Sequence, residues 1–156
     1  MTAPNQLATF LWFKAGDLDE AIPFYESIFD DFTVNHLNPM FPGGPLFTAG
    51  FSICGHQLIG MSVEGGPTFN DAISLSLSVD GQEEVDRLWE ALTSDGGAPG
   101  LCGWLKDKFG VSWQVTPIQM SAYLGNPDSA KREYAMAALR KMTKIVIDDF
   151  SPKEQA

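Results

Sequence analysis

The sequence is short of several chemically informative residues, and each shortage excludes a class of protein. Its cysteines, Cys54 and Cys102, are too few and too far apart for a disulfide framework or a CxxC metal knuckle, so we expect two free thiols. The 10 basic residues are outnumbered by 20 acidic ones, which gives a net charge of −10. That charge disfavours nucleic acid and anionic membrane surfaces as partners.

Long apolar runs are also lacking. No stretch approaches the roughly eighteen apolar residues of a membrane span, and Met1–Gln6 has neither the basic region nor the apolar run of a signal peptide. We therefore expect a cytoplasmic protein. Apolar residues make up 44% of the chain and charged residues 19%, which is ordinary for a globular protein and argues against disorder.

A strand followed by a helix is encoded twice. Alternating residues over 7–13 predict a strand, and an apolar stripe from Leu18 to Phe29 predicts the helix after it; Ile73–Val79 and Gln82–Leu92 repeat both patterns. An offset of 64 residues superposes the two copies and matches residues of similar chemistry: Leu11 with Leu75, Phe13 with Leu77, Glu20 with Glu84, Ala21 with Val85, Phe24 with Leu88, Tyr25 with Trp89, Glu26 with Glu90 and Ile28 with Leu92.

Each predicted helix is followed by strand-like segments separated by turn residues. In the first copy these segments span residues 32–37, 46–53 and 57–63, and the second copy ends in a strand at Val111–Thr116. Gly65-Gly66-Pro67 is the expected hinge between a module at about 7–64 and a module at about 70–117. An extension at about 118–150 follows, in which Asp128–Met142 is predicted to be helical.

A tandem βαβββ repeat resembles the vicinal oxygen chelate superfamily of glyoxalase I, extradiol dioxygenases and bleomycin- or fosfomycin-resistance proteins. Within that superfamily, the segment Cys102–Gln114, with Phe69–Ser74 upstream, is similar to the PhnB-like branch, which often carries the name 3-demethylubiquinone-9 3-methyltransferase. The resemblance implies a single α+β domain over residues 1–156. Its two modules would curl into a cup of mixed sheet with the helices outside, and a C-terminal helix would be added.

The sequence does not support the methyltransferase name. A methyltransferase of the usual kind has a glycine-rich turn between its first strand and helix, so that the backbone approaches the cofactor closely. Here that junction is Lys14-Ala15-Gly16-Asp17. We expect no S-adenosylmethionine and no other cofactor.

Metal-dependent members of the superfamily bind one divalent ion with a ligand from the first and the last strand of each module, typically His or Gln and then Glu. The corresponding positions here are Phe10, Ser74, Gln114 and, in an uncertain register, Met61 or Ser62. A ring carbon cannot donate to a metal, a hydroxyl is a poor ligand, and a neutral amide brings no charge. His36 and His56 are expected near a strand end and in a turn. We predict no bound metal.

Period-2 alternation assigns the faces of the strands. Under the helices it places Leu11, Phe13, Ile73, Leu75, Leu77, Trp113 and Val115. Toward the cup it places Phe10, Trp12, Ser74, Ser76, Ser78, Ser112, Gln114 and Thr116, so that one wall is aromatic and the other carries hydroxyl and amide groups. Such a lining is typical of a small-molecule pocket, and Trp104 is a further predicted ligand contact by stacking. Alternatively, these side chains satisfy one another around water in an unused cleft.

A catalytic role is not assigned by the sequence. Cys102 is a weak candidate nucleophile, with Lys106 and Lys108 nearby but no histidine partner. Asp107 is a possible acid or base, but a turn residue between two solvated cations is the simpler interpretation.

These observations favour a metal-free homodimer that binds a small, partly apolar or aromatic molecule in the cup, with or without turnover. One alternative is a metal-dependent lyase, isomerase or dioxygenase, and another is a dimeric interaction module with a vestigial cup. The basic residues near the C-terminus are most simply a solvated helix face, and the alternative is that they complement an acidic second copy of the chain: Lys131, Arg132, Arg140, Lys141 and Lys144.

Overall fold

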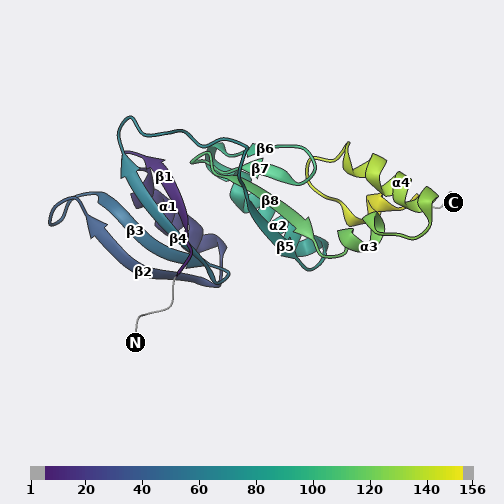
Figure 1. Ribbon diagram of the computed structural model, residues 1–156, viewed down its shortest axis with the longest axis horizontal. Coiled ribbons are helices and arrows are strands. Elements are labelled where there is room, and N and C mark those ends of the chain that lie inside the picture. The colour runs from purple at the N-terminus through teal and green to yellow at the C-terminus, as the bar shows by residue number, and fades with distance from the viewer. Residues whose placement is uncertain (1–5, 153–156) are drawn as a thin grey trace. The chain divides into compact units, whose positions relative to one another are not determined.

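The protein is described by a computed structural model over residues 6–152. The chain divides into two compact units, Met1–Phe69 and Asn70–Ala156, called the first and the second unit below. Each unit contains one four-stranded sheet and a helix packed on it (Figure 1). The two predicted βαβββ modules therefore lie one in each unit.

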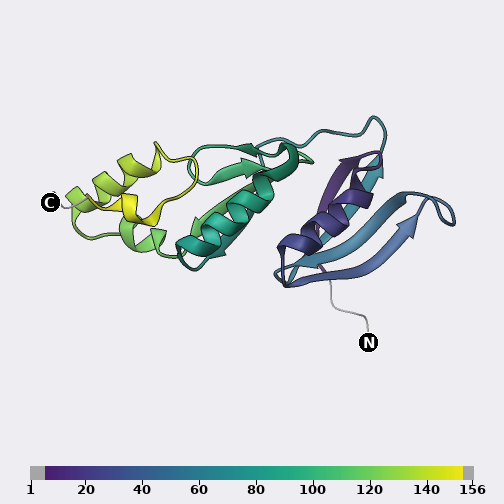
Figure 2. The same cartoon turned by 180° about the vertical axis from the view of Figure 1, so that it is seen from behind.

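The first unit consists of a mixed sheet and one helix. Its elements, in chain order, are β1 (Thr9–Lys14), α1 (Asp17–Ile28), β2 (Phe32–Pro39), β3 (Leu46–Ile53) and β4 (His56–Val63). The strand order is β1-β4-β3-β2, with β1 parallel to β4 and the other pairs antiparallel. Figure 2 shows α1 lying across one face of this sheet. The strands and the helix predicted for this half are confirmed.

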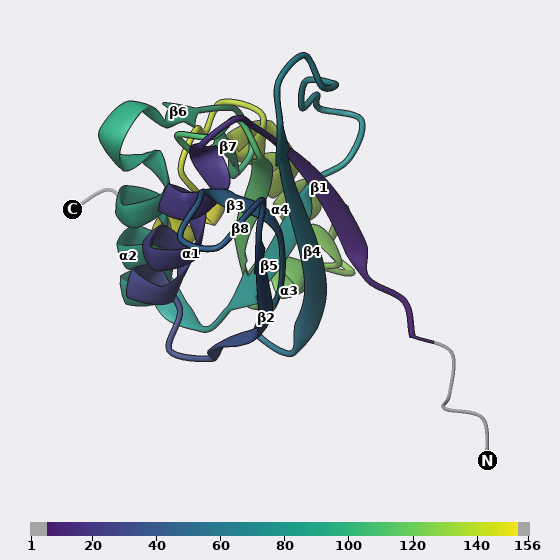
Figure 3. The same cartoon turned by 90° about the vertical axis from the view of Figure 1, so that its left-hand side faces the viewer.

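The second unit repeats this plan with shorter strands. Its elements are β5 (Leu75–Val79), α2 (Gly81–Thr93), the 3-10 turn η1 (Ser94–Gly96), β6 (Ala98–Pro99), β7 (Trp104–Lys106) and β8 (Ser112–Pro117). The strand order β5-β8-β7-β6 and the parallel pairing of β5 with β8 match the first unit. In Figure 3, α2 lies to one side of β5 and β8. The α+β class and the tandem repeat are confirmed, whereas a cup shared by both modules stays a prediction.

Alternation along β1 separates the two faces of the first sheet. Leu11 and Phe13 are only 7% and 1% exposed on the side of α1, whereas Phe10 and Trp12 are 47% and 39% exposed on the opposite side. The predicted faces of this strand are therefore confirmed. Burial of the two inward side chains stabilises the unit by roughly 1.5–3 kcal/mol each.

In the second sheet the same rule holds with one exception. Trp113 and Val115 are buried on the side of α2, and Ser76 is exposed on the opposite side. The predicted burial of Ile73 is wrong, because this side chain is 64% exposed. It precedes β5, which begins at Leu75, so strand alternation does not govern its direction.

The pairing of parallel strands resolves the register of β4. Trp12 pairs with Met61, and Ser76 pairs with Gln114. Since the offset of 64 residues places Trp12 on Ser76, Met61 is the counterpart of Gln114. Ser62 is 2% exposed and belongs to the helix-facing side of the sheet.

The turn between β7 and β8 is built around a buried carboxylate. Asp107 is 2% exposed. Its Oδ1 accepts hydrogen bonds from the backbone N–H groups of Phe109 and Val111, both at 3.0 Å, and its Oδ2 accepts one from Trp113 Nε1 at 2.9 Å. These donors offset the large cost of burying a charge. The predicted turn is confirmed, and the Asp107 carboxylate is buried within it. An acid or base role for Asp107 stays a prediction.

A C-terminal extension completes the second unit with α3 (Met120–Leu124), α4 (Ser129–Leu139) and the 3-10 turn η2 (Ile147–Phe150). The Asp128 side chain caps α4 by accepting hydrogen bonds from Ala130 N and Lys131 N, at 3.0 and 3.3 Å. The predicted helix at Asp128–Met142 is thus confirmed, with an earlier end. The extension has a small core of its own, formed by Ala135, Met142, Ile145 and Phe150.

Within residues 6–152, no helix is long and apolar enough to cross a membrane. Both cysteines are free thiols, as the sequence predicts, with Cys54 exposed and Cys102 partly buried.

We predict that Asp107→Ala lowers the free energy of unfolding by about 3 kcal/mol, because three buried donors lose their acceptor. Urea denaturation followed by tryptophan fluorescence measures this change. Asp30→Ala, at an exposed position, is the matched control and should change stability by less than about 0.5 kcal/mol. Equal effects of the two substitutions would contradict a structural role for the Asp107 carboxylate.

Candidate ligand-binding site

Polar and aromatic side chains gather on the face of the second sheet that points away from α2, here called the open face. The strand register forms one row across it from Ser76 through Gln114 to Trp104. The neighbouring row runs from Ser112 through Lys106 to Ala98. Because successive side chains on a strand alternate, both rows project from the same side of the sheet.

Within these rows, two groups of hydrogen-bonded side chains form. In the first, Gln114 Nε2 donates to Ser74 Oγ at 2.7 Å. In the second, Ser112 Oγ donates to Asp71 Oδ1 at 2.9 Å, and Lys106 Nζ lies 3.1 Å from the same oxygen. Ser112 is 3% exposed, so its hydroxyl is held in the hydrogen bond with Asp71.

The Asp71 carboxyl is ionised at neutral pH. A hydrogen bond from the Lys106 ammonium, and a weaker one from the Ser112 hydroxyl, lower the pKa of Asp71 below its ordinary value of 3.8. The side chains of Lys106 and Asp71 are 43% and 66% exposed. An ion pair this exposed is screened by solvent and contributes little to stability, so both charges remain accessible to a ligand.

A cavity of about 520 Å³ lies at this end of the open face. Its lining combines an indole, several small or aliphatic residues and the ion pair: Asp71, Ala98, Pro99, Gly100, Leu101, Trp104, Leu105 and Lys106. Binding pockets for small molecules have volumes of roughly 300–1,000 Å³, and their surface is mostly apolar with a few oriented polar groups. The arrangement therefore offers a flat surface for stacking and one charge of each sign.

The structure brings together five of the seven predicted ligand contacts, on or next to the open face: Ser74, Ser76, Trp104, Ser112 and Gln114. Phe10 and Trp12 form a separate aromatic pair in the first unit, with ring centroids 6.0 Å apart. For all seven residues, a role in ligand binding stays a prediction.

Sequence reasoning missed Asp71 and Lys106 as members of the site. Lys106 follows Trp104 by two residues on a strand, so period-2 alternation already indicated that the two share a face. No comparable signal points to Asp71, because a hydrogen bond and an ion pair across 41 and 35 residues hold it in place.

The weak nucleophile candidate Cys102 is turned toward the C-terminal extension. Its thiol donates to the Leu139 carbonyl oxygen, with Sγ and O 3.4 Å apart. This contact gives the thiol a hydrogen-bonding role, and no base among the described contacts activates it. A catalytic role for Cys102 stays a prediction.

The positions that bind a metal in other members of the superfamily do not fit a divalent ion here. They are occupied by Phe10, Met61, Ser74 and Gln114, of which Phe10 has no donor atom and Met61 offers only a soft thioether. The remaining hydroxyl and amide bind each other. Among residues 6–152, no three His, Cys, Asp or Glu side chains are grouped to hold a metal.

The fold defines the class of protein. Two βαβββ modules with the same strand order are the architecture of the vicinal oxygen chelate superfamily. The chain belongs to the PhnB-like family within it, because the family model described as 3-demethylubiquinone-9 3-methyltransferase matches residues 5–116.

Solved structures agree with this assignment. The PhnB protein of Bacillus cereus is 32% identical to this chain, with a TM-score of 0.63, and the match covers 72% of this chain and 99% of that one. PA1353 of Pseudomonas aeruginosa is 22% identical, with a TM-score of 0.56 and coverage of 72% and 98%. FosX of Listeria monocytogenes, solved with Mn(II) and sulfate, is 16% identical, with a TM-score of 0.51 and coverage of 72% and 92%. The PA1353 and FosX structures, at 22% and 16% identity, show the fold alone. No curated protein matches the chain.

We predict that Lys106→Met raises the pKa of Asp71 toward 3.8, because the main hydrogen bond that lowers it is removed. In the wild type the Asp71–Lys106 contact is therefore present above pH 3.8 and is lost as pH falls through the lowered pKa. Carboxyl carbon NMR titration measures both values. Lys108→Met, which removes a cation placed 5.1 Å from the Phe109 ring centroid, should leave the pKa of Asp71 unchanged. An equal shift in both variants would rule out the specific contact.

Proposed function

We propose that the protein binds a small, partly aromatic or apolar molecule in the cavity beside Trp104, without a bound metal ion. The observation that carries this proposal is the cavity of about 520 Å³, with an indole and an exposed ion pair in its lining. A planar ligand would stack on Trp104 and bury the Leu101 side chain, which is 61% exposed. A charged group on the ligand would pair with Lys106 or Asp71.

Methyl transfer is not part of the proposal. Gly16 is the N-cap residue of α1, and its N–H donates to Ser62 Oγ at 2.9 Å, while that hydroxyl donates to the Lys14 carbonyl oxygen at 2.6 Å. A serine side chain thus occupies the helix end that a methyltransferase of the usual kind leaves open to its cofactor. We infer that the family name is a label and does not describe the chemistry of this chain.

Homodimerisation and a cytoplasmic location are part of the same proposal. The homodimer rests on the net charge of −10 together with the basic residues of the C-terminal region. The cytoplasmic location rests on the lack of long apolar runs in the sequence. The ligand is accordingly expected to be a small molecule, with neither nucleic acid nor membrane as a partner.

We predict that Trp104→Ala weakens binding of anilinonaphthalene sulfonate about tenfold, because the dye loses a stacking surface within the cavity. A fluorescence titration measures the affinity. Tyr134→Ala removes an aromatic side chain that is 42% exposed on α4 and is the matched control. If wild type does not bind the dye, or if Trp104→Ala binds it as tightly as wild type, the cavity is not the binding site.

A second prediction separates this proposal from metal-dependent chemistry of the FosX kind. Adding Mn²⁺ or Zn²⁺ should leave the melting temperature of the chelator-treated protein unchanged, because the donor set does not fit a divalent ion. A specific ion at a hundred times its Kd would add about 2.7 kcal/mol of stability and raise the melting temperature by several degrees. Such a rise, together with stoichiometric metal in native protein, would favour the metal-dependent alternative.

A further inference from the structure

One wall of the cavity is a tight loop, Pro99–Trp104. Gly100 N donates to the Trp104 carbonyl oxygen at 2.7 Å, and Trp104 N donates to the Leu101 carbonyl oxygen at 3.1 Å. The loop is therefore closed on itself by backbone hydrogen bonds. Four of its residues line the cavity: Pro99, Gly100, Leu101 and Trp104.

The tip of this loop is bound to the C-terminal extension. Cys102 N donates to the Met142 carbonyl oxygen and Gly103 N to that of Thr143, both at 2.8 Å. The Cys102 thiol adds its contact with Leu139, described above. Each loop amide that faces the extension thus has a partner in the segment Leu139–Thr143.

Gly103 permits this close approach. Its φ is +82°, and a Cβ built at this position would lie 2.9 Å from the Val115 carbonyl oxygen and 3.1 Å from the Ile145 side chain. Both distances are shorter than normal van der Waals contacts, so no larger residue fits without a shift. The loop tip is therefore enclosed between β8 and the extension.

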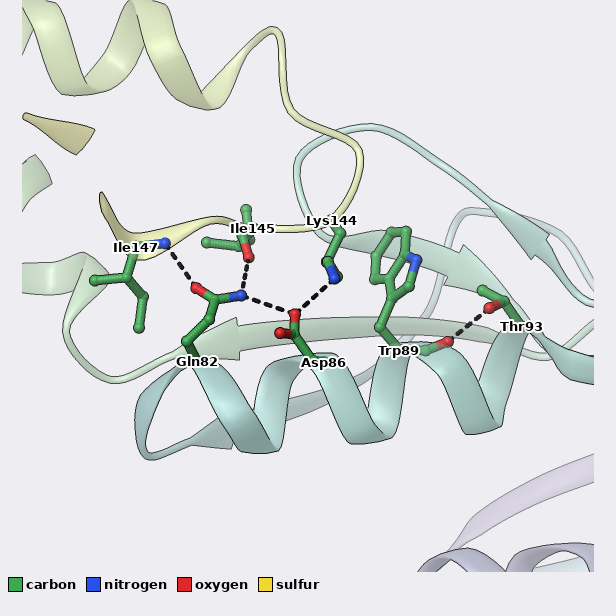
Figure 4. A network of polar contacts seen from close by, with 7 residues as sticks. All are labelled: Gln82, Asp86, Trp89, Thr93, Lys144, Ile145 and Ile147. Carbon is green, nitrogen blue, oxygen red and sulfur yellow. Dashed lines mark hydrogen bonds and ion pairs between the residues drawn. The ribbon is translucent and has the colours of Figure 1, made fainter. Parts of the chain in front are cut away.

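The extension is in turn held by a side chain of α2 (Figure 4). Gln82 Nε2 donates to the Ile145 carbonyl oxygen at 3.0 Å, and Gln82 Oε1 accepts from Ile147 N at 2.8 Å. The intervening Val146 is extended, with φ −117° and ψ 110°. The side-chain amide thus binds both neighbours of an extended residue, as a peptide group of an adjacent parallel strand would.

An acidic neighbour holds this amide in place. Asp86 Oδ1 accepts from Gln82 Nε2 at 2.9 Å and lies 2.6 Å from Lys144 Nζ. The same carboxylate oxygen therefore joins the glutamine to the extension. Gln82 and Asp86 of α2 therefore contact the part of the extension that begins at Lys144. That part follows directly after Met142 and Thr143, which bind the loop tip.

We propose that the segment Leu139–Ile147 is a bracket that fixes the cavity wall Pro99–Trp104, with Gln82 as its positioning residue. Releasing the bracket frees the loop tip and weakens binding in the cavity, a consequence that rests on the function proposed above. The family match ends at residue 116, so the bracket lies outside the part of the chain that the family model covers. The bracket thus supports the cavity of this chain through residues that the family model does not cover.

Hydrogen exchange in the full-length protein tests the bracket without a ligand. In Gln82→Ala, the Cys102 and Gly103 amides should exchange about tenfold faster, because the two hydrogen bonds from the Gln82 side chain no longer hold the extension. Amides of β3 and β4 in the first unit should be unchanged. Glu83→Ala, at an exposed position on the same helical turn, is the matched control. If Gln82→Ala does not fold, Lys144→Met should give a smaller increase at the same two amides.

Exchange at Cys102 and Gly103 that is unchanged, or that rises equally throughout the second unit, would overturn the bracket. The coupling to binding has its own readout, since Gln82→Ala should bind anilinonaphthalene sulfonate several-fold more weakly than wild type. Equal dye affinities in the two proteins would overturn that coupling. If wild type does not bind the dye, the proposed function fails, and the exchange data alone decide whether the bracket exists.

Discussion

The open face of the second sheet depends on one buried carboxylate. Asp107 binds two backbone N–H groups of its own turn and the Trp113 indole, and thereby fixes where β7 ends and β8 begins. Trp113 points to the helix side, so the residues on either side of it, Ser112 and Gln114, must point to the open face. The geometry of the candidate site is thus a consequence of how an anion is kept satisfied inside the protein.

The repeat shows which residues of this chain stand at the positions that hold the metal ion in metal-dependent members of the superfamily. The four positions expected to hold the ion recur at matched places in the two modules, but Phe10, Met61, Ser74 and Gln114 occupy them. Phe10, Met61 and Gln114 lie on the side of their sheet away from the helix, and Ser74 is hydrogen-bonded to Gln114. The same backbone can therefore carry a metal site in one relative and a stacking surface in another.

Beyond the repeat, the extension changes what the second module can do. In the first module β2 and β3 have eight residues each, whereas their counterparts in the second module, β6 and β7, have two and three. The short strands leave a loop at Pro99–Trp104 in which the Gly103 carbonyl oxygen accepts from Val115 N of β8, while the Cys102 and Gly103 amides donate to acceptors outside the sheet. Backbone carbonyls of Met142 and Thr143 are those acceptors, so a segment outside the repeat contacts the loop that forms one wall of the cavity.

The sequence by itself determined the α+β class, the two βαβββ modules, and the inward and outward faces of β1 and β8, because hydrophobic periodicity is a local signal. It left the register of Met61 open and identified Asp107 only as a turn residue, without its buried partners. Only the tertiary structure decided the register of Met61 and the burial of Asp107. It also decided the pairing of Asp71 with Lys106 and the hydrogen bonds between Gln82 and the extension. Each depends on partners that are close in space but distant in the chain, up to 65 residues for Gln82 and Ile147, and no local pattern encodes such a contact.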